Sequence, residues 1–303
     1  MRSAGPASLA STVRPIDAGA AALIVLLCLS WGFNQVTIKL ALPDIPPLIH
    51  STIRSIGAAI IIWLWMRWRD LPLWERDGTL VPGLVAGLLF GLEFLLIFRG
   101  LLYTTASRAV LFLYVAPFFV VLASRWLFPG DRFRLSQWIG LAMSFAGIVI
   151  VFGVPTGLHP KELIGDAMIL AAAAGWAATT LVIKATSLNR VSSEKTLMYQ
   201  LAVSIPVCGI GALAFGETMT GMPGSVALAA LAYQTIWIVC VTFVLWFALI
   251  VRYSASRLSA FTFLTPLFGV AAGHVVLGDP ITPAFAAALV LVIAGLILVN
   301  RPR

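Results

Sequence analysis

The chain has 303 residues, of which 60% are hydrophobic and 11% are charged, and its mean hydropathy is +1.00. A water-soluble domain carries about 25% charged residues, so this composition excludes an ordinary soluble protein and indicates that lipid is the solvent. The net charge is +8, but the basic residues lie between apolar segments rather than on one face, which argues against nucleic-acid binding.

Apolar runs divide the chain into ten segments. A membrane helix needs about 20 mostly apolar residues, and we place a boundary wherever charges, Pro-Gly pairs or polar clusters interrupt such a run. The predicted spans are 18–40, 46–66, 80–102, 106–128, 135–152, 164–185, 196–215, 225–251, 256–277 and 283–300. No connecting segment is long enough for a soluble domain, so any function must lie within or between the helices.

The basic residues lie mostly on one side of these spans. Fifteen Lys and Arg residues fall on the side of the N-terminus, against Lys39, Arg108 and Lys161 on the other side. Loops rich in Lys and Arg stay in the cytoplasm. The short terminal segments 1–17 and 301–303 are therefore expected to be cytoplasmic, which requires an even number of spans.

The two halves of the chain, 18–153 and 164–300, match at an offset of 145 to 149 residues. Ala-Ser-Arg ending at Arg108 matches Ala-Ser-Arg ending at Arg257, and Pro117 matches Pro266. Because each half has five spans, an odd number, the second half must enter the membrane from the opposite side. We predict an all-α polytopic membrane protein with ten transmembrane helices arranged as two inverted five-helix repeats, an architecture typical of alternating-access transporters.

These motifs also carry a family resemblance. The segment Leu29-Ser30-Trp31-Gly32-Phe33-Asn34-Gln35 with Lys39, and the paired Ala-Ser-Arg and mid-helix Pro, resemble the EamA type of the drug/metabolite transporter superfamily. The chain as a whole resembles its YddG-type amino-acid exporters. The resemblance implies a bacterial inner-membrane carrier that exports aromatic and other neutral amino acids. Other metabolites and drugs, which the superfamily also handles, stay open as cargo.

Two symmetry-related helices each carry a tryptophan followed, three and four residues later, by two hydrogen-bonding side chains. Residues at these spacings share a helix face. The pattern fits an amphipathic substrate, although polar side chains in membranes also bond between helices. The predicted substrate-binding residues of this kind are Trp31, Asn34 and Gln35 in the first helix, and Trp176, Thr179 and Thr180 in the sixth.

Two charged residues lie inside the spans of the first half. Glu93 is near the middle of the third helix, where a charge costs about 3 kcal/mol on insertion scales. Pairing with Arg54 or Arg99, proton coupling and binding of a substrate ammonium group stay open for Glu93. Arg54 could bind a substrate carboxylate or extend its charge to the membrane surface.

The other candidates come from aligned polar or aromatic positions. We predict further substrate-binding residues at His50, Tyr199, Gln200, Tyr233, Gln234 and Trp237. The matched Pro117 and Pro266 are predicted gating residues, because each removes a backbone hydrogen bond and permits a bend.

Other functional classes find little support in the sequence. The Asp residues lie at predicted helix ends, which disfavours an intramembrane aspartyl protease, and no GxxxxGK[ST] motif is present for ATP. The His residues are too scattered for a metal or haem pair, and a channel does not need an inverted repeat. We expect no enzyme activity, no cofactor, no metal and no nucleic acid; the expected partners are the bilayer and an amino-acid substrate, and the expected state is a monomer.

Overall fold

The computed structural model describes residues 16–104, 106–128, 133–153, 159–278 and 281–301. Most of the predicted terminal segments 1–17 and 301–303 therefore lie outside the described residues. In the described part, ten helices are long and apolar enough to cross a membrane, and their ends fall within four residues of the predicted spans.

Helices α1 to α13, together with a wide helix η2, form these spans, and a short 3-10 helix η1 (Ser187–Arg190) links α7 to α8. The spans are α1 (Ala18–Ala41), α2 (Pro47–Trp68), α3 (Leu80–Gly100), α4 with α5 (Ala106–Leu113, Ala116–Leu127), α6 (Leu135–Phe152), α7 (Pro160–Ala185), α8 (Ser193–Ala214), α9 with η2 and α10 (Ser225–Tyr233, Gln234–Phe243, Val244–Arg252), α11 with α12 (Ala255–Phe261, Leu264–Leu277) and α13 (Pro283–Asn300).

The distribution of side chains is the reverse of that in a soluble protein. Val290 and Ile297 are 68% and 65% exposed, whereas Arg54, Gln200 and Thr242 are almost completely buried. Exposed aliphatic surface of this kind needs lipid as its solvent, and helices satisfy their backbone polar groups without water. The chain is therefore a multi-pass membrane protein.

Three spans that the sequence predicts as single helices are interrupted. The fourth breaks between α4 and α5 and the ninth between α11 and α12, just before Pro117 and Pro266. A proline has no N–H to donate to the carbonyl four residues earlier, so the regular helix is interrupted at that point. The eighth span contains the wide helix η2, where hydrogen bonds run from residue i to i+5. The η2 segment contains no proline that would predict this irregularity from the sequence.

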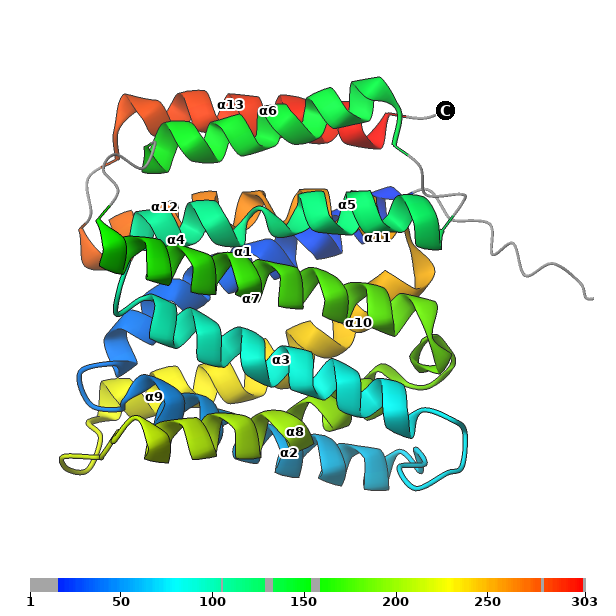
Figure 1. Cartoon of the computed structure of the whole chain (residues 1–303), viewed down its shortest axis with the longest axis vertical. Helices are drawn as coiled ribbons and strands as arrows, with labels where there is room; N and C mark the ends of the chain where they lie inside the picture. Colours follow the sequence, from blue (N-terminus) through cyan, green and yellow to red (C-terminus); the bar gives the residue numbers. More distant parts are fainter. Residues whose placement is uncertain (1–15, 105, 129–132, 154–158, 279–280, 302–303) are drawn as a thin grey trace, which may run out of the picture.

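Two matched helix pairs lie at opposite ends of the molecule (Figure 1), with α6 beside α13 at one end and α2 beside α8 at the other. Ser55 and Ser204 are 149 residues apart, which is the repeat offset, and their hydroxyl groups are 3.2 Å apart. Ser144 donates to the carbonyl of Val292, 148 residues further on, at 3.5 Å. Equivalent residues that touch must lie near a twofold axis, so the pseudo-twofold axis passes through both pairs.

The pair α6 and α13 packs backbone against backbone. A Cβ atom placed on Gly140 would lie 2.5 Å from the carbonyl oxygen of Gly295, and one on Gly147 would lie 2.9 Å from that of Ala288. The 148-residue offset of the repeat relates Gly140 to Ala288 and Gly147 to Gly295, so each contact is the symmetry equivalent of the other. Small residues let membrane helices approach this closely, because lipid supplies no hydrophobic force between them.

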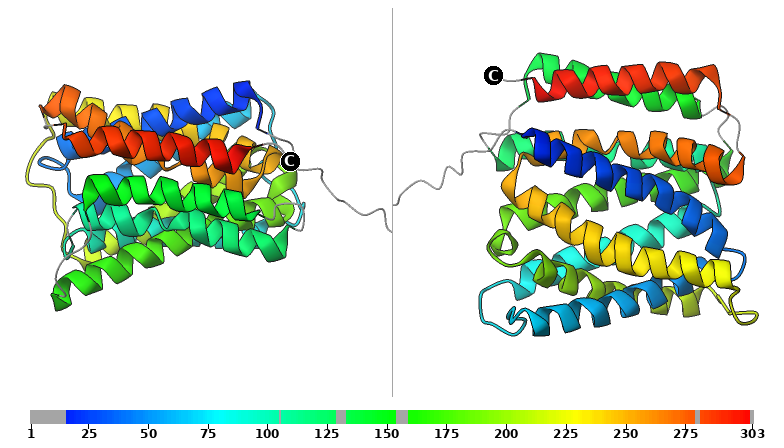
Figure 2. Two further views of the ribbon diagram at one scale, coloured as in Figure 1. Left: turned by 90° about the horizontal axis from the view of Figure 1, so that it is seen from above. Right: turned by 180° about the vertical axis from the view of Figure 1, so that it is seen from behind.

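The helix directions place the beginning of α1 and the end of α13 at one face, which we call the terminal face (Figure 2). Loops at both faces hold the α2–α8 pair. Glu217 accepts hydrogen bonds from the N–H groups of Leu48 and Ile49, at 2.9 and 3.1 Å, and so caps α2. At the terminal face, Asp77 binds the ammonium group of Lys195 in the first turn of α8, at 2.7 Å.

The groups around Asp77 keep its carboxyl group ionised. The Lys195 ammonium and the Thr79 hydroxyl hold the pKa of the Asp77 carboxyl well below its usual range. A lowered pKa means that the attraction is present above the pKa of an ordinary Asp and is lost as the pH falls through the lowered value. The contact is therefore intact at neutral pH.

The close approach of α6 and α13 predicts that Gly140→Ala destabilises the protein. The added methyl group would have to separate the two helices, and overpacking of this kind costs about 1–3 kcal/mol. The transition temperature of the purified protein in detergent is expected to fall. It is measured by size-exclusion chromatography of samples heated to different temperatures. Gly209→Ala is the matched control, because its added Cβ would meet its nearest neighbour, Thr52, at 3.7 Å. Equal transition temperatures for the two variants would contradict this packing.

Candidate functional site

A cavity of about 230 Å³ lies between the two repeats, near the centre of the molecule. Both repeats contribute to it, because α1, α2, α3 and α4 supply one part of its wall and α7, η2, α10 and α12 supply the rest. Pockets for drug-sized ligands are usually about 300–1,000 Å³, so this cavity suits a small molecule.

Two opposite charges face the cavity from α2 and α3. Arg54 is 2% exposed, and its guanidinium group lies 4.6 Å from the centre of the Phe94 ring. The Nε atom of Arg54 has no hydrogen-bond partner within the described residues. Glu93 lines the same cavity, and no described residue forms an ion pair or hydrogen bond with its carboxylate. Among the described residues no ion pair or hydrogen bond joins the two side chains, so both can form one with a ligand.

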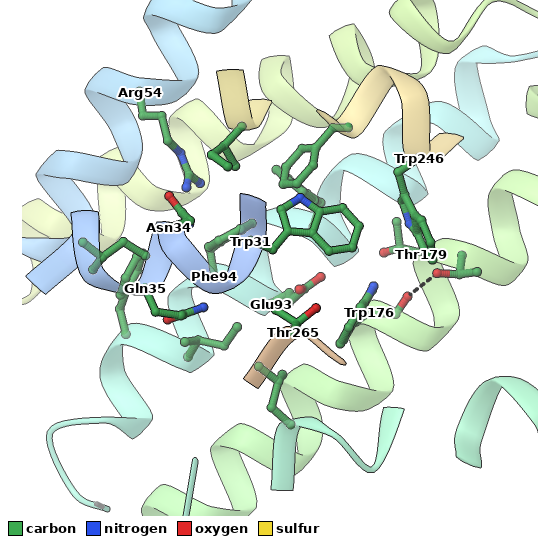
Figure 3. A pocket seen from close by; sticks show the side chains of 18 of the residues that line it. Trp31, Asn34, Gln35, Arg54, Glu93, Phe94, Trp176, Thr179, Trp246 and Thr265 are labelled. Atoms are coloured by element: carbon green, nitrogen blue, oxygen red, sulfur yellow. Dashed lines mark hydrogen bonds between the residues drawn. The ribbon is translucent and has the colours of Figure 1, made fainter. Parts of the chain in front are cut away.

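Aromatic rings form much of the remaining wall (Figure 3). Trp31 on α1 donates its indole N–H to the hydroxyl of Thr242, at 2.9 Å, and packs edge-on against Trp246, with the ring centres 5.3 Å apart. On the opposite repeat, Trp176 packs edge-on against Tyr114, at 6.1 Å. These hydrogen bonds and ring contacts fix the orientation of the aromatic wall before a ligand binds.

The two predicted polar pairs lie on this wall but differ in their partners. The Thr180 hydroxyl donates to the carbonyl of Trp176, at 3.1 Å, so that hydrogen bond stays within α7. The Thr179 hydroxyl is buried and has no partner within the described residues. On α1, the side-chain oxygen of Asn34 accepts from the Thr37 hydroxyl, at 3.2 Å, whereas Gln35 is exposed at the cavity.

Eight of the predicted residues come together around the cavity. They are Trp31, Asn34, Gln35, Arg54, Glu93, Trp176, Thr179 and Thr180. Their positions agree with the repeat, since α1 and α7 contribute matched triplets. Pairing with Arg99, one of the alternatives left open for Glu93, is absent among the described residues, because the Arg99 guanidinium lies 3.7 Å from the centre of the Phe215 ring.

Six other predicted binding residues do not line the cavity. His50 and Gln200 are buried in α2 and α8, and the Tyr199 hydroxyl lies 3.1 Å from that of Thr79. Tyr233 and Trp237 bind Ser30 of α1, at 3.3 and 3.0 Å. Gln234 is completely buried at the start of η2. The gating candidates Pro117 and Pro266 also lie outside the cavity lining, at the helix breaks.

The helix geometry explains which residues the sequence missed. In the eighth span, the i to i+5 pattern of η2 changes which residues share a face, and the cavity-facing residues that the sequence did not indicate are Ile238, Phe243 and Phe247. On α3, the sequence does contain the signal, because Phe90, Phe94 and Phe98 recur every four residues beside Glu93.

The cavity lining is more exposed at the face opposite the terminal face than at the terminal face itself. Leu101, at the end of α3, is 40% exposed, whereas Phe247 and Ile183, which lie toward the terminal face, are 5% and 1% exposed. At the terminal face α11 is buried and packs on α5, but the equivalent pair, α4 and α12, has at most a marginal contact. The two repeats are thus in different arrangements, one closed and one open.

Comparisons with known proteins agree with this architecture. The model of the EamA-like transporter family matches residues 18–153 and 163–301. The chain belongs to the EamA-like transporter family. Its function as a transporter follows from this membership, and the related proteins found are also named as transporters.

Several relatives of this EamA-like transporter cover almost its whole length. An "Uncharacterized transporter YvbV" of Bacillus subtilis is 28% identical over 92% of this chain and 91% of the relative. A "Probable amino-acid metabolite efflux pump" of Salmonella typhimurium is 25% identical over 90% of this chain and 92% of the relative. One solved crystal structure, 21% identical, covers 93% of this chain and 96% of its own, with a TM-score of 0.78, and so shares its fold.

The one-sided opening of the transporter predicts different access of water to its two ends. In a protein with Cys28, Cys208 and Cys240 replaced by alanine, Leu101→Cys is expected to react rapidly with a membrane-impermeant maleimide. Phe247→Cys is expected to react slowly, because thiolate formation needs water. Labelling is measured in nanodiscs, where both faces are accessible to the reagent. Leu88→Cys, on exposed aliphatic surface, is the control for lipid-facing thiols and is expected to stay unlabelled. Equal labelling rates at positions 101 and 247 would contradict a cavity closed at the terminal face.

Proposed function

We propose that this transporter is a secondary carrier that exports neutral amino acids, aromatic ones included, across the bacterial inner membrane by alternating access. The observation that carries the proposal is the unpaired Arg54 and Glu93 in a small aromatic cavity. A free amino acid has a carboxylate, an ammonium group and a side chain, and the cavity has a group of matching chemistry for each.

Each charge has a defined role in this proposal. The Arg54 guanidinium binds the substrate carboxylate, because its planar donors match the two carboxylate oxygens. The Glu93 carboxylate binds the substrate ammonium group. A buried charge without a partner is costly in a membrane, so a zwitterion that satisfies both charges at once gains affinity over a ligand that satisfies one.

The aromatic wall selects the side chain. Trp31, Trp176 and Trp246 present apolar ring surface, and edge-on packing with an aromatic substrate adds about 0.5–1.5 kcal/mol to its burial. Aliphatic side chains fit the same surface without that gain. Two relatives named as probable amino-acid metabolite efflux pumps support this substrate class.

The proposed orientation places the terminal face in the cytoplasm. The excess of Lys and Arg on that side supports it. With this orientation the cavity opens to the outside, which is the state that releases an exported substrate.

The matched helix breaks are the proposed gating elements. Pro117 and Pro266 lie in the first turns of α5 and α12, and the half-helices before them, α4 and α11, differ in packing. Exchange of these two arrangements about the breaks would close the outer end and open the terminal face. Inverted repeats permit such an exchange because each half can adopt the conformation of the other.

Transport by purified protein in proteoliposomes tests the substrate. We expect saturable uptake of labelled Phe that Met and Thr inhibit, measured with and without a pH gradient. Loss of gradient dependence in Glu93→Gln would add proton coupling to the role of Glu93. Uptake of nucleosides or sugars without amino acids would keep the carrier and overturn the amino-acid substrate.

The roles proposed for Arg54 and Glu93 predict that each substitution weakens inhibition by a different substrate analogue. Arg54→Gln is expected to weaken inhibition of uptake by 3-phenylpropanoate, and Glu93→Gln to weaken inhibition by phenethylamine. Each loss should be roughly 10- to 100-fold in the inhibition constant, since a hydrogen bond to a charged group contributes about 1.5–3 kcal/mol. Arg99→Gln is the matched control, because Arg99 does not line the cavity. Equal losses for both ligands in both variants would contradict the assigned roles.

A further inference from the structure

A second cavity, of about 290 Å³, lies on the outer surface between α2 and the η2–α10 segment. We call it the α2–η2 groove, and its walls are apolar side chains that include Ile61, Ile236, Cys240 and Val244. Ile61, Trp65 and Ile236 are 36%, 42% and 54% exposed, so these parts of the groove face the surrounding bilayer. It shares no lining residue with the central cavity.

The wide helix η2 separates the two cavities. Ile238 and Phe243 line the central cavity, whereas Ile236, Cys240 and Val241 line the α2–η2 groove. The groove lies in the half of the membrane nearer the terminal face, because α2 ends at Trp68 only three residues beyond the groove residue Trp65. Its depth therefore runs from the headgroup level into one leaflet.

Charged groups are gathered at the headgroup end of the groove. Glu194, in the first turn of α8, lines the groove and accepts a hydrogen bond from the indole N–H of Trp65, at 3.3 Å. No Lys or Arg of the described residues lies within 4.0 Å of the Glu194 carboxylate. The Arg69 guanidinium lies 5.7 Å from the centre of the Trp65 ring. The Glu194 carboxylate, which lines the groove, and the Arg69 guanidinium, which lies outside its lining, are thus both close to Trp65.

We propose that the α2–η2 groove binds a phospholipid with a primary ammonium headgroup, namely phosphatidylethanolamine. One acyl chain lies in the apolar groove, the ammonium group donates hydrogen bonds to Glu194, and the phosphate faces Arg69. Apolar contact with the acyl chain favours binding, but the surrounding lipid offers similar contact, so the headgroup decides which lipid is retained.

The arrangement of charges distinguishes this lipid from others. A headgroup whose phosphate is its only charged group, such as phosphatidylglycerol, would place negative charge near the Glu194 carboxylate with no ammonium group to offset it. Phosphatidylcholine has the same net charge as phosphatidylethanolamine, but its quaternary ammonium has no N–H to donate. Trp65, at the junction of apolar groove and headgroup, is typical of residues that anchor proteins at this depth.

Native mass spectrometry of the purified full-length protein tests the proposal. The protein is incubated with equal amounts of phosphatidylethanolamine, its N-methyl, N,N-dimethyl and trimethyl (choline) forms, and phosphatidylglycerol, all with the same chains. We expect retention to fall stepwise as N–H donors are replaced by methyl groups, with phosphatidylglycerol retained least. Equal retention across the methyl series, or preference for phosphatidylglycerol, would overturn the proposal without any variant.

Variants then locate the site. Glu194→Gln is expected to lower the retention of phosphatidylethanolamine roughly 10-fold, to the level of the choline lipid, because one charged hydrogen-bond acceptor is lost. Glu75→Gln, an exposed carboxylate at the same face, is the matched control and should retain the preference. Val241→Trp, which fills the groove, should lower retention of all five lipids. An unchanged lipid preference in Glu194→Gln together with unchanged retention in Val241→Trp would place the lipid elsewhere and overturn the assignment. These measurements need no transport, so their outcome is independent of the proposed amino-acid export.

Discussion

The absence of water from the bilayer core governs this structure. Every backbone polar group must find a partner inside the chain, which leaves helices as the only elements of the ten described spans. The same constraint directs polar side chains inward. Arg54, Glu93 and Thr179 would be costly on the lipid side, and the central cavity is the place where a ligand can solvate them.

Lipid also removes the usual reason for helices to associate, so close packing has to replace it. At α6 and α13 the contact depends on Gly140, Gly147 and Gly295, and at α2 and α8 it depends on the hydroxyl groups of Ser55 and Ser204. Both pairs lie on the pseudo-twofold axis. The repeats are thus joined at two ends by contacts that are symmetric, while the helices between those ends are free to pack differently in each half.

The wide helix η2 connects the inside of the molecule with its outer surface. One of its faces lines the central cavity and another lines the α2–η2 groove. Helices with i to i+5 hydrogen bonds are rare and occur often at functional sites. The wider turn changes which side chains face each surface, and a change in lipid contact and a change in cavity shape would involve the same few turns.

The sequence by itself determined the number of spans, their inverted repeat and the matched triplets that begin at Trp31 and Trp176, because hydropathy and sequence offset are properties of the chain alone. Only the tertiary structure decided which polar residues meet. Tyr233 and Trp237 lie in the predicted span, but their side chains bind α1. Which side of that span faces the cavity depends on η2, and no residue type in the sequence predicts η2. Likewise, the open and closed ends depend on the packing of α4 and α11, which have nearly the same sequence motif in both halves but different neighbours.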